Sequence, residues 1–430
     1  MDTTVYSARH HDFEGDSRRG KKLVAALALY LLAIGLTFSG FDPARLLNGL
    51  RVIIVSPDLL IDDYTSIAGV GPAFFNAALC TLVIVLLLKR SRVEVTGPVI
   101  AGVFTVAGFS LFGKNIANIL PGLLGVVLYA KANNRPFSES VIVALFGTAL
   151  APLSSSVAFG LGIPVPWNIP VAVAAGTATG FFLSPIARHV LDFHRGYNLY
   201  NMGFAAGFVG TVIMSTLKAF GVPVEGEFHW AQLGPGYVAP CLIALFVALI
   251  VYGMIVDRDW RSSYRLLLGS SGRLVSDFVR FYGLGATMVN MGLMGLMAMA
   301  AILLIGASWN GPMIGAALTI VGFSAFGKHP RNALPPMLGV AFMASLSRYG
   351  LSSPSSQLAV LFSSTLAPVT GEYGFVPGFI SGMLHLVLVQ VVGSLHGGLD
   401  LYNNGFSGGL AAGLFVPVLE WIREWRKHEA

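Results

Sequence analysis

The chain carries the same polar motif twice, each time inside strongly apolar sequence. Residues 108–126 begin Gly-Phe-Ser-Leu-Phe-Gly-Lys, and residues 322–340, 214 positions later, begin Gly-Phe-Ser-Ala-Phe-Gly-Lys. Twelve of these nineteen positions are identical, including an asparagine and a Leu-Pro pair downstream of the lysine. A duplicated segment that glycine and proline interrupt, within hydrophobic sequence, is typical of channels and transporters built from two repeats. The chain is therefore constrained to fold as two copies of one unit.

The duplication extends over most of the chain. Asp63 matches Asp277 at the same spacing, and the block His194-x-Gly-x-x-Leu-Tyr-Asn201 recurs 202 residues later as the block that ends at Asn403. Small changes of spacing between matched blocks are what loops absorb. We therefore predict these parts: a cytoplasmic tail over 1–21, repeat 1 over 22–222, an extracytoplasmic linker over 223–235, repeat 2 over 236–422 and a cytoplasmic tail over 423–430.

Composition identifies the solvent of this chain as lipid. Only 11% of the residues are charged and 55% are hydrophobic, whereas a soluble domain has about a quarter of charged residues. The net charge of +6 is assigned to cytoplasmic loops, and nucleic acid is not expected as a partner. The sequence has no phosphate-binding loop, catalytic triad spacing or metal-ligand cluster. We therefore predict no catalytic residue, no metal, no cofactor and no enzymatic activity.

Segments that approach the twenty or so apolar residues needed to span a bilayer recur in both repeats. The fold class predicted is an all-α polytopic membrane protein with two inverted-topology repeats of five to seven segments each, about 10–14 in total. The third and fourth segments of each repeat could form a broken or re-entrant pair, which leaves the number of crossings odd. The predicted segments are 23–40, 67–88, 96–113, 117–130, 139–160, 168–190 and 198–220, then 236–256, 283–306, 312–327, 331–347, 356–371, 375–394 and 400–420.

Loop charges support the inversion independently. The loop after the second segment of repeat 1 reads Lys89-Arg90-Ser91-Arg92, while its counterpart at 307–310 is uncharged. The loop after the first segment of repeat 2 is rich in arginine, and its counterpart in repeat 1 is poorer. Because basic loops stay on the cytoplasmic side, this alternation predicts a multi-pass protein of the cell inner membrane with both termini cytoplasmic.

The repeated motif supplies the first candidate solute-binding residues. Backbone that glycine and proline break is tolerated within a membrane only where it lines a cavity or is buried in protein. Pro121 and Pro335 are expected to end or kink a helix near the midplane, with the freed backbone facing a polar cavity. Lys114 and Lys328 either reach such a site or extend to the membrane interface. The candidates from this motif are Ser110, Lys114, Asn118, Ser324, Lys328 and Asn332.

Further candidates are asparagines at matched positions. Asn201 and Asn403 open the last segment of each repeat and are expected to cap its helix, or alternatively to present an amide to a solute. Asn76 and Asn290 lie beside glycines in apolar runs, where a polar side chain serves a site or hydrogen-bonds a neighbouring helix. Glu372 has no acidic counterpart in repeat 1; it is expected in an extracellular connection, or alternatively as a carrier of a coupled proton.

The paired Gly-Phe-Ser-x-Phe-Gly-Lys and Leu-Tyr-Asn-x-Gly-Phe blocks resemble an uncharacterised family of bacterial multipass membrane proteins, a domain of unknown function, over nearly the whole chain. More weakly, residues 199–204 and their twin resemble urea channels. That resemblance implies two inverted repeats of about five spans and a re-entrant element. The Leu-Pro-x-x-Pro-Phe pore motif of urea channels has only partial counterparts here, at Leu120-Pro121 and Leu334-Pro335.

Together these patterns favour a membrane permease, either a channel or a secondary transporter, for a small polar or ionic solute bound at the midplane between the repeats. The alternative is a scaffold without transport activity, or a subunit of a larger membrane complex, which predicts a packed centre without a polar cavity. The expected partners are the solute and the lipid bilayer, and a homo-oligomer is compatible with the sequence.

Overall fold

The protein is described by a computed structural model at residues 13–59, 61–224, 226–236 and 238–429. Over these residues the chain is helical, and nine helices are long and apolar enough to cross a membrane. The chain is therefore a polytopic membrane protein, as the composition predicts. Residues 1–12 of the expected N-terminal tail lie outside the described residues.

The elements of the two repeats follow in corresponding order, although α3, η2 and η4 of repeat 1 have no separate counterpart in repeat 2. Repeat 1 comprises α1 (Phe13–Phe38), α2 (Pro43–Val55), α3 (Tyr64–Ile67), α4 (Val70–Arg90), α5 (Gly97–Phe109), α6 (Ile119–Ala132), η2 (Phe137–Glu139), α7 (Val141–Gly147), η3 (Thr148–Leu150), α8 (Ala151–Ser155), η4 (Ser156–Gly160), α9 (Asn168–His194) and α10 (Asn201–Ala219). Repeat 2 comprises α11 (Ala239–Val256), α12 (Trp260–Leu267), α13 (Phe278–Leu304), α14 (Gly311–Phe323), α15 (Pro330–Leu346), α16 (Pro354–Phe362), η5 (Ser363–Leu366), α17 (Ala367–Tyr373), α18 (Phe375–His396) and α19 (Asn403–Glu429).

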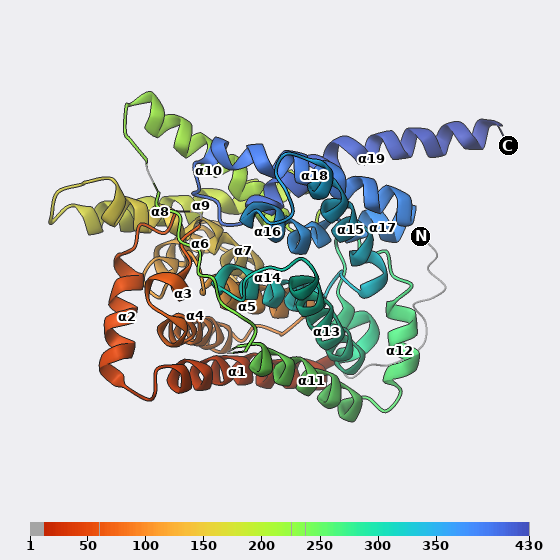
Figure 1. Cartoon of the computed structure of the whole chain (residues 1–430), viewed down its shortest axis with the longest axis horizontal. Helices are drawn as coiled ribbons and strands as arrows, with labels where there is room; N and C mark the ends of the chain where they lie inside the picture. Colours follow the sequence, from red (N-terminus) through yellow and green to blue (C-terminus); the bar gives the residue numbers. More distant parts are fainter. Residues whose placement is uncertain (1–12, 60, 225, 237, 430) are drawn as a thin grey trace.

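The two repeats run in opposite directions. Helices α1 and α11, the first of each repeat, lie along the same edge of the molecule in Figure 1, but the helices that follow them, α2 and α12, stand at opposite ends. The arginine-rich α12 lies at the end toward which α19 points. We call this end the basic side, and the end that carries α2 the opposite side. The arrangement agrees with the inverted repeats that the loop charges predict.

The short helices α5 and α14 form the centre of the molecule and join the repeats. They pack against each other with every residue of both helices at least largely covered. A Cβ atom on Gly108 would lie 2.5 Å from the carbonyl oxygen of Gly315, and one on Gly315 would lie 2.5 Å from that of Gly108. Glycine is thus required here because the two backbones touch, as in close helix pairs of membrane proteins.

Each central helix begins on a carboxylate from the other repeat. Asp63 Oδ1 accepts the N–H of Gly311 at 3.2 Å, and Asp277 Oδ1 accepts the N–H of Gly97 at 3.0 Å. A carboxylate suits a helix N-terminus because the first N–H groups have no partner in the helix and the helix dipole is positive there. Burial raises the pKa of both carboxyls, and the N–H donors oppose this rise.

Some predicted boundaries are wrong. Helix α1 begins at Phe13 rather than near residue 23, because its polar first turns are held by partners: Asp16 accepts the N–H of Leu284, and Ser17 accepts that of Val95. Helix α19 continues to Glu429, through the stretch predicted as a tail. Helices α2 and α12 were not predicted, since neither is long or apolar enough to read as a span.

The expectation for the two prolines is also corrected in part. The chain does break where predicted, between α5 and α6 and between α14 and α15, but the breaks precede the prolines. Pro121 is the third residue of α6, where its missing N–H removes no helical bond. Pro335, followed by Pro336, lies inside α15. The breaks therefore come from the Gly-Lys segments, and the prolines belong to the helices that follow.

Candidate functional site

Asn76 and Asn290 satisfy the backbone at the two helix breaks. Asn76 Nδ2 donates to the carbonyl oxygens of Ser110 and Lys114, at 2.8 Å each. Asn290 Nδ2 donates to those of Ser324 and Lys328, at 2.8 and 2.7 Å. These carbonyls have lost their helical partners, and leaving them unbonded inside a membrane costs several kcal/mol each. The amide donors of both asparagines are thus occupied by the backbone that they hold in place.

The serines and the second pair of asparagines of the motif also bond to nearby backbone. Ser110 Oγ donates to Val106 O and Ser324 Oγ to Ile320 O, at 2.7 Å each. Asn118 Nδ2 donates to Gly113 O at 3.1 Å, and Asn332 Nδ2 donates to Gly327 O at 2.9 Å. None of these four side chains lies in the wall of the central cavity described below. In this arrangement they shape the turns between the short helices.

The two lysines are buried, and each reaches across to the other repeat. Both are 0% exposed, so the alternative in which they extend to the membrane interface is wrong. Lys114 Nζ donates to Tyr402 OH at 2.5 Å and to Thr148 Oγ1 at 2.8 Å. Lys328 Nζ donates to Tyr200 OH at 2.5 Å and to Ser364 Oγ at 2.8 Å. The lysine motif of each repeat therefore bonds the Leu-Tyr-Asn motif of the other repeat, and the two motifs form one structural unit.

Aromatic rings complete the surroundings of each lysine. Lys114 Nζ lies 4.5 Å from the ring centroid of Tyr402 and 5.1 Å from that of Phe109. Lys328 Nζ lies 4.2 Å from the ring centroid of Tyr200 and 5.2 Å from that of Phe323. A cation over an aromatic face is stabilised by about 2 kcal/mol or more when it is shielded from water. These contacts partly offset the cost of burying each ammonium group.

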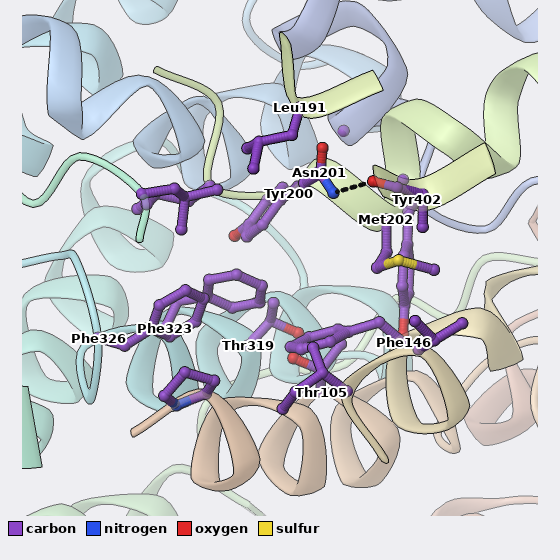
Figure 2. Close-up of a pocket in the computed structure, with 18 of the residues that line it drawn as sticks. Thr105, Phe146, Leu191, Tyr200, Asn201, Met202, Thr319, Phe323, Phe326 and Tyr402 are labelled. Carbon is purple, nitrogen blue, oxygen red and sulfur yellow. Dashed lines mark hydrogen bonds between the residues drawn. The ribbon is translucent and has the colours of Figure 1, made fainter. Parts of the chain in front are cut away.

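Asn201 and Asn403 do not cap their helices, so the capping interpretation is wrong. Asn201 Oδ1 bonds His194 Nε2 at 2.9 Å, and its Nδ2 donates to Ala187 O at 3.0 Å, the bond dashed in Figure 2. Asn403 makes the matched pair of bonds, to His396 Nε2 at 3.0 Å and to Val389 O at 3.4 Å. Each asparagine therefore fastens the start of its helix to the preceding helix.

A cavity of about 290 Å³ lies between the repeats and brings matched residues of both together. Figure 2 shows Thr105, Phe146, Tyr200, Asn201 and Met202 from repeat 1, with Thr319, Phe323, Phe326 and Tyr402 from repeat 2. Of the sequence-predicted candidates, Asn201 lines this cavity, and the two lysines lie directly behind its tyrosines. The wall is mainly aromatic and aliphatic, with a few polar groups.

Several residues of the cavity escaped the sequence reasoning. The tyrosines of Leu-Tyr-Asn and the phenylalanines of Gly-Phe-Ser are repeated as faithfully as the lysines, and this repetition was the available signal for Phe109, Phe323, Tyr200 and Tyr402. Thr105 gave the same signal, since Thr319 is its match. The two differ in the structure: Thr319 Oγ1 donates to Gly315 O at 2.8 Å, whereas the hydroxyl of Thr105 is buried without a hydrogen-bond partner among the described residues. An unpaired buried hydroxyl in a cavity wall is a natural contact for a ligand.

A buried carboxylate belongs to repeat 1 alone. Asp58 Oδ1 accepts from Tyr64 OH at 2.6 Å, and Oδ2 accepts from Asn115 Nδ2, Asn118 Nδ2 and Ser155 Oγ at 2.7 to 2.9 Å. Asp58 lies outside the membrane-spanning helices, and burial raises the pKa of its carboxyl to about 8 against the opposing effect of these donors. The positions in repeat 2 that match Asp58, Tyr64, Asn115 and Ser155 hold Gly272, Phe278, His329 and Gly371, and only Asn118 is kept, as Asn332. This cluster therefore departs from the internal symmetry.

Access to the cavity differs between the two sides. On the basic side its wall includes Arg188 and Val275, and Val275 is 82% exposed. The residue matched to Val275 in repeat 1 is Ile61, which is 7% exposed and is not part of the wall. The linker between the repeats covers it, since His229 N–H donates to Ile61 O at 3.2 Å. The cavity wall is thus exposed at Val275, whereas the linker covers the matched position at Ile61.

The family model described as Protein of unknown function (DUF1576) matches the chain over residues 42–219 and 257–421. The chain belongs to this family, and the two matched regions correspond to the two repeats. No curated protein and no solved structure matches the chain. The resemblance to urea channels and the bacterial origin stay predictions.

Proposed function

We propose that this protein is a membrane permease that binds a small solute in the cavity between its inverted repeats. The observation that carries the proposal is the cavity itself: about 290 Å³, at the repeat interface, with Phe109, Phe323, Tyr200 and Tyr402 in matched places around it. This volume is near the lower end of small-molecule sites, which are mostly apolar with a few placed polar groups. The scaffold alternative predicts a packed centre, and the cavity weighs against it.

The residues of the cavity wall narrow the class of solute that we expect. A purely ionic solute would lose its hydration against aromatic and aliphatic side chains without replacement, which is costly. A small organic molecule with an apolar body and one or two polar groups fits better. Its polar groups would bond the free hydroxyl of Thr105 and the amide of Asn404, which also lies in the wall.

One-sided access favours a carrier over a channel. A channel needs a path that is open to both sides in one conformation, whereas a carrier exposes its site to one side at a time. The exposed Val275 and the covered Ile61 occupy matched positions, so exchange of the two repeat conformations would close the basic side and open the other. We assign the present arrangement to the state that faces the basic side, which the loop charges predict to be cytoplasmic.

The experiment begins with a panel of small organic solutes screened by thermal stabilisation of the purified protein, because a ligand that binds the folded state raises its melting temperature. Solutes that stabilise are tested for uptake and counterflow in proteoliposomes. Thr105→Val should weaken the stabilisation several-fold at unchanged basal stability. Thr211→Val is the matched control, since that hydroxyl already bonds Gly207 O on α10 at 2.7 Å.

The proposal predicts uptake above that of protein-free vesicles for at least one stabilising solute, and loss of that uptake in Thr105→Val but not in Thr211→Val. If no solute of the panel stabilises the protein, and if the vesicles are as impermeable as empty ones, the scaffold or subunit alternative is favoured. Equal effects of the two threonine variants would place the binding site elsewhere.

A further inference from the structure

The internal symmetry fails at one buried position beside the cavity. Asn198, two residues before Tyr200, is matched by Asp400, two residues before Tyr402. Both side chains are 0% exposed. Glu372, which also has no acidic counterpart, is bonded at the surface to Arg423 at 3.3 Å, and its expected extracellular location stays a prediction. Asp400 is therefore the carboxyl that distinguishes the repeats near their shared cavity.

Asn198 uses both ends of its amide. Its Oδ1 accepts from the N–H of Tyr200 at 3.2 Å and from Thr365 Oγ1 at 2.6 Å, and its Nδ2 donates to the carbonyl oxygen of Gly405 at 3.0 Å. The residue that the repeat matches to Gly405 is Gly203. Applied to the other repeat, the pseudo-symmetry would place Asp400 Oδ2, the atom that corresponds to Nδ2, beside the carbonyl of Gly203.

Of these hydrogen bonds, Asp400 makes only the counterpart of the one with the backbone N–H of the tyrosine two residues later. Its Oδ1 accepts the N–H of Tyr402 at 2.9 Å, as Asn198 does for Tyr200. Its Oδ2 is buried and has no hydrogen-bond partner among the described residues. An ionised Oδ2 would oppose a carbonyl oxygen there, since both atoms are acceptors. A protonated Oδ2 carries an O–H and can donate to that carbonyl, which reproduces the bond that Asn198 makes with its N–H.

We propose that Asp400 is a proton-binding site that couples the permease to a proton gradient. The inference rests on the proposed function for the coupling, although the proton site stands on its own geometry. In the protonated state Asp400 is neutral and bonds like Asn198. On release of the proton it becomes a buried carboxylate, which is tolerated within a membrane only with a counter-charge.

The groups that face Asp400 support a proton rather than a metal cation. Lys114, which comes from the segment between α5 and α6, interacts electrostatically with Asp400 and would repel a second cation. His396 Nδ1 accepts the N–H of Asp400 at 3.2 Å, so its proton is on Nε2, which bonds Asn403 Oδ1, and the ring is neutral. Tyr402 is the remaining titratable neighbour.

Tyr402 links this site to the cavity. Asp400 Oδ1 accepts the N–H of Tyr402, and Lys114 Nζ donates to the hydroxyl of Tyr402. The side chain of Tyr402 forms part of the cavity wall. When Asp400 loses its proton, its negative charge attracts the Lys114 ammonium that is bonded to the hydroxyl of Tyr402. The matched set of Asn198, Lys328 and Tyr200 contains no carboxyl and does not respond. Protonation therefore alters one wall of the cavity and leaves the other unchanged.

Infrared spectroscopy tests the proton site without any solute. The purified wild-type protein should show protonated-carboxyl C=O absorption that disappears as the pH rises. Asp58 contributes one component of this absorption, and Asp400→Asn should lose the component that remains in Asp58→Asn. Asparagine is accommodated at the matched position 198, so this variant is expected to fold. Asp192→Asn, at an exposed position, is the control and should keep that component. Lys114→Met should shift the disappearance of that component to higher pH, because the counter-charge is lost.

An Asp400→Asn spectrum identical to that of the wild type over the whole pH range would overturn the proton site. Coupling is tested separately with a pH-sensitive dye trapped in proteoliposomes: a transported solute should carry protons with it in the wild type, whereas Asp400→Asn should exchange solute without moving protons. Proton-independent transport in the wild type would overturn the coupling and leave the permease. Absence of all transport would overturn the proposed function and leave the infrared result intact.

Discussion

Removal of the hydroxyl of Tyr200 should destabilise the protein because Lys328 depends on it. Lys328 Nζ is 0% exposed and has two hydrogen-bond acceptors, Tyr200 OH and Ser364 Oγ. A hydrogen bond to a charged group contributes about 1.5–3 kcal/mol, and loss of one partner leaves the other group unsatisfied. Tyr200→Phe keeps the ring under the ammonium and removes only the hydroxyl. We therefore expect the free energy of unfolding to fall by about 2 kcal/mol.

A double-mutant cycle isolates this bond from other consequences of the substitution. In Lys328→Met the charge is absent, and an apolar side chain of similar length takes its place; such a replacement of a buried ion is often neutral or stabilising. In that background Tyr200→Phe should cost less than about 0.5 kcal/mol, the scatter expected for uncoupled positions. The coupling energy between the two positions is then about 1.5 kcal/mol.

Equilibrium unfolding in mixed detergent micelles, followed by circular dichroism, gives the four free energies of the cycle. Tyr197→Phe is the matched control, because its hydroxyl faces another neutral hydroxyl, that of Tyr373, at 3.3 Å. Its cost should stay below about 1 kcal/mol. An equal cost of Tyr200→Phe with and without Lys328 would refute the exchanged lysine–tyrosine contact as a source of stability.

Three further perturbations and one mapping experiment test the rest of the structure. Asp277→Ala removes the acceptor at the N-terminus of α5 and should lower stability by about 0.5–2 kcal/mol in unfolding assays. The pKa of Asp58 in the folded protein is raised to about 8, above its unfolded value of about 3.9, so the folded state binds the extra proton. The contribution of this proton to stability is therefore complete below about pH 4 and is lost as the pH rises through about 8. Asp58→Asn should flatten that part of a stability–pH profile. Gly108→Ala should reduce the yield of folded protein, because its Cβ would meet the backbone of α14 at 2.5 Å, whereas Gly122→Ala, with open space around it, should not; equal yields of the two variants would argue against the α5–α14 contact. Reporter fusions should place the C-terminus on the cytoplasmic side and residues 223–234 on the other, and the same side for both would contradict the inverted repeats.

The roles of several candidate site residues were not predictable from the sequence. The asparagines at 76 and 290 were candidates for solute contact because a buried amide is costly unless bonded, but the sequence does not say whether a ligand or a nearby carbonyl satisfies it. The structure assigns both amides to backbone at the helix breaks. The tyrosines were overlooked because an aromatic residue in apolar sequence usually belongs to a packed core.

The sequence by itself determined the membrane solvent, the helical class, the duplication and the inversion. These follow from composition, from segment length and from the alternation of basic loops, all of which are local properties that can be read along the chain. The mismatch between Asn198 and Asp400 is also visible in the aligned repeats. Its meaning is not, because burial and the lack of a partner for one carboxylate oxygen are properties of the folded protein.

Only the tertiary structure decided which motif meets which. Lys114 bonds a tyrosine 288 positions away and Lys328 one 128 positions away, and the symmetry of the motifs permits pairing within a repeat as well as between repeats. The contact of α5 with α14 at Gly108 and Gly315 sets the repeats in antiparallel register. That register brings each lysine to the tyrosine of the opposite repeat and leaves the cavity between them. Physically, the choice depends on close packing of two backbones, which no local sequence pattern encodes.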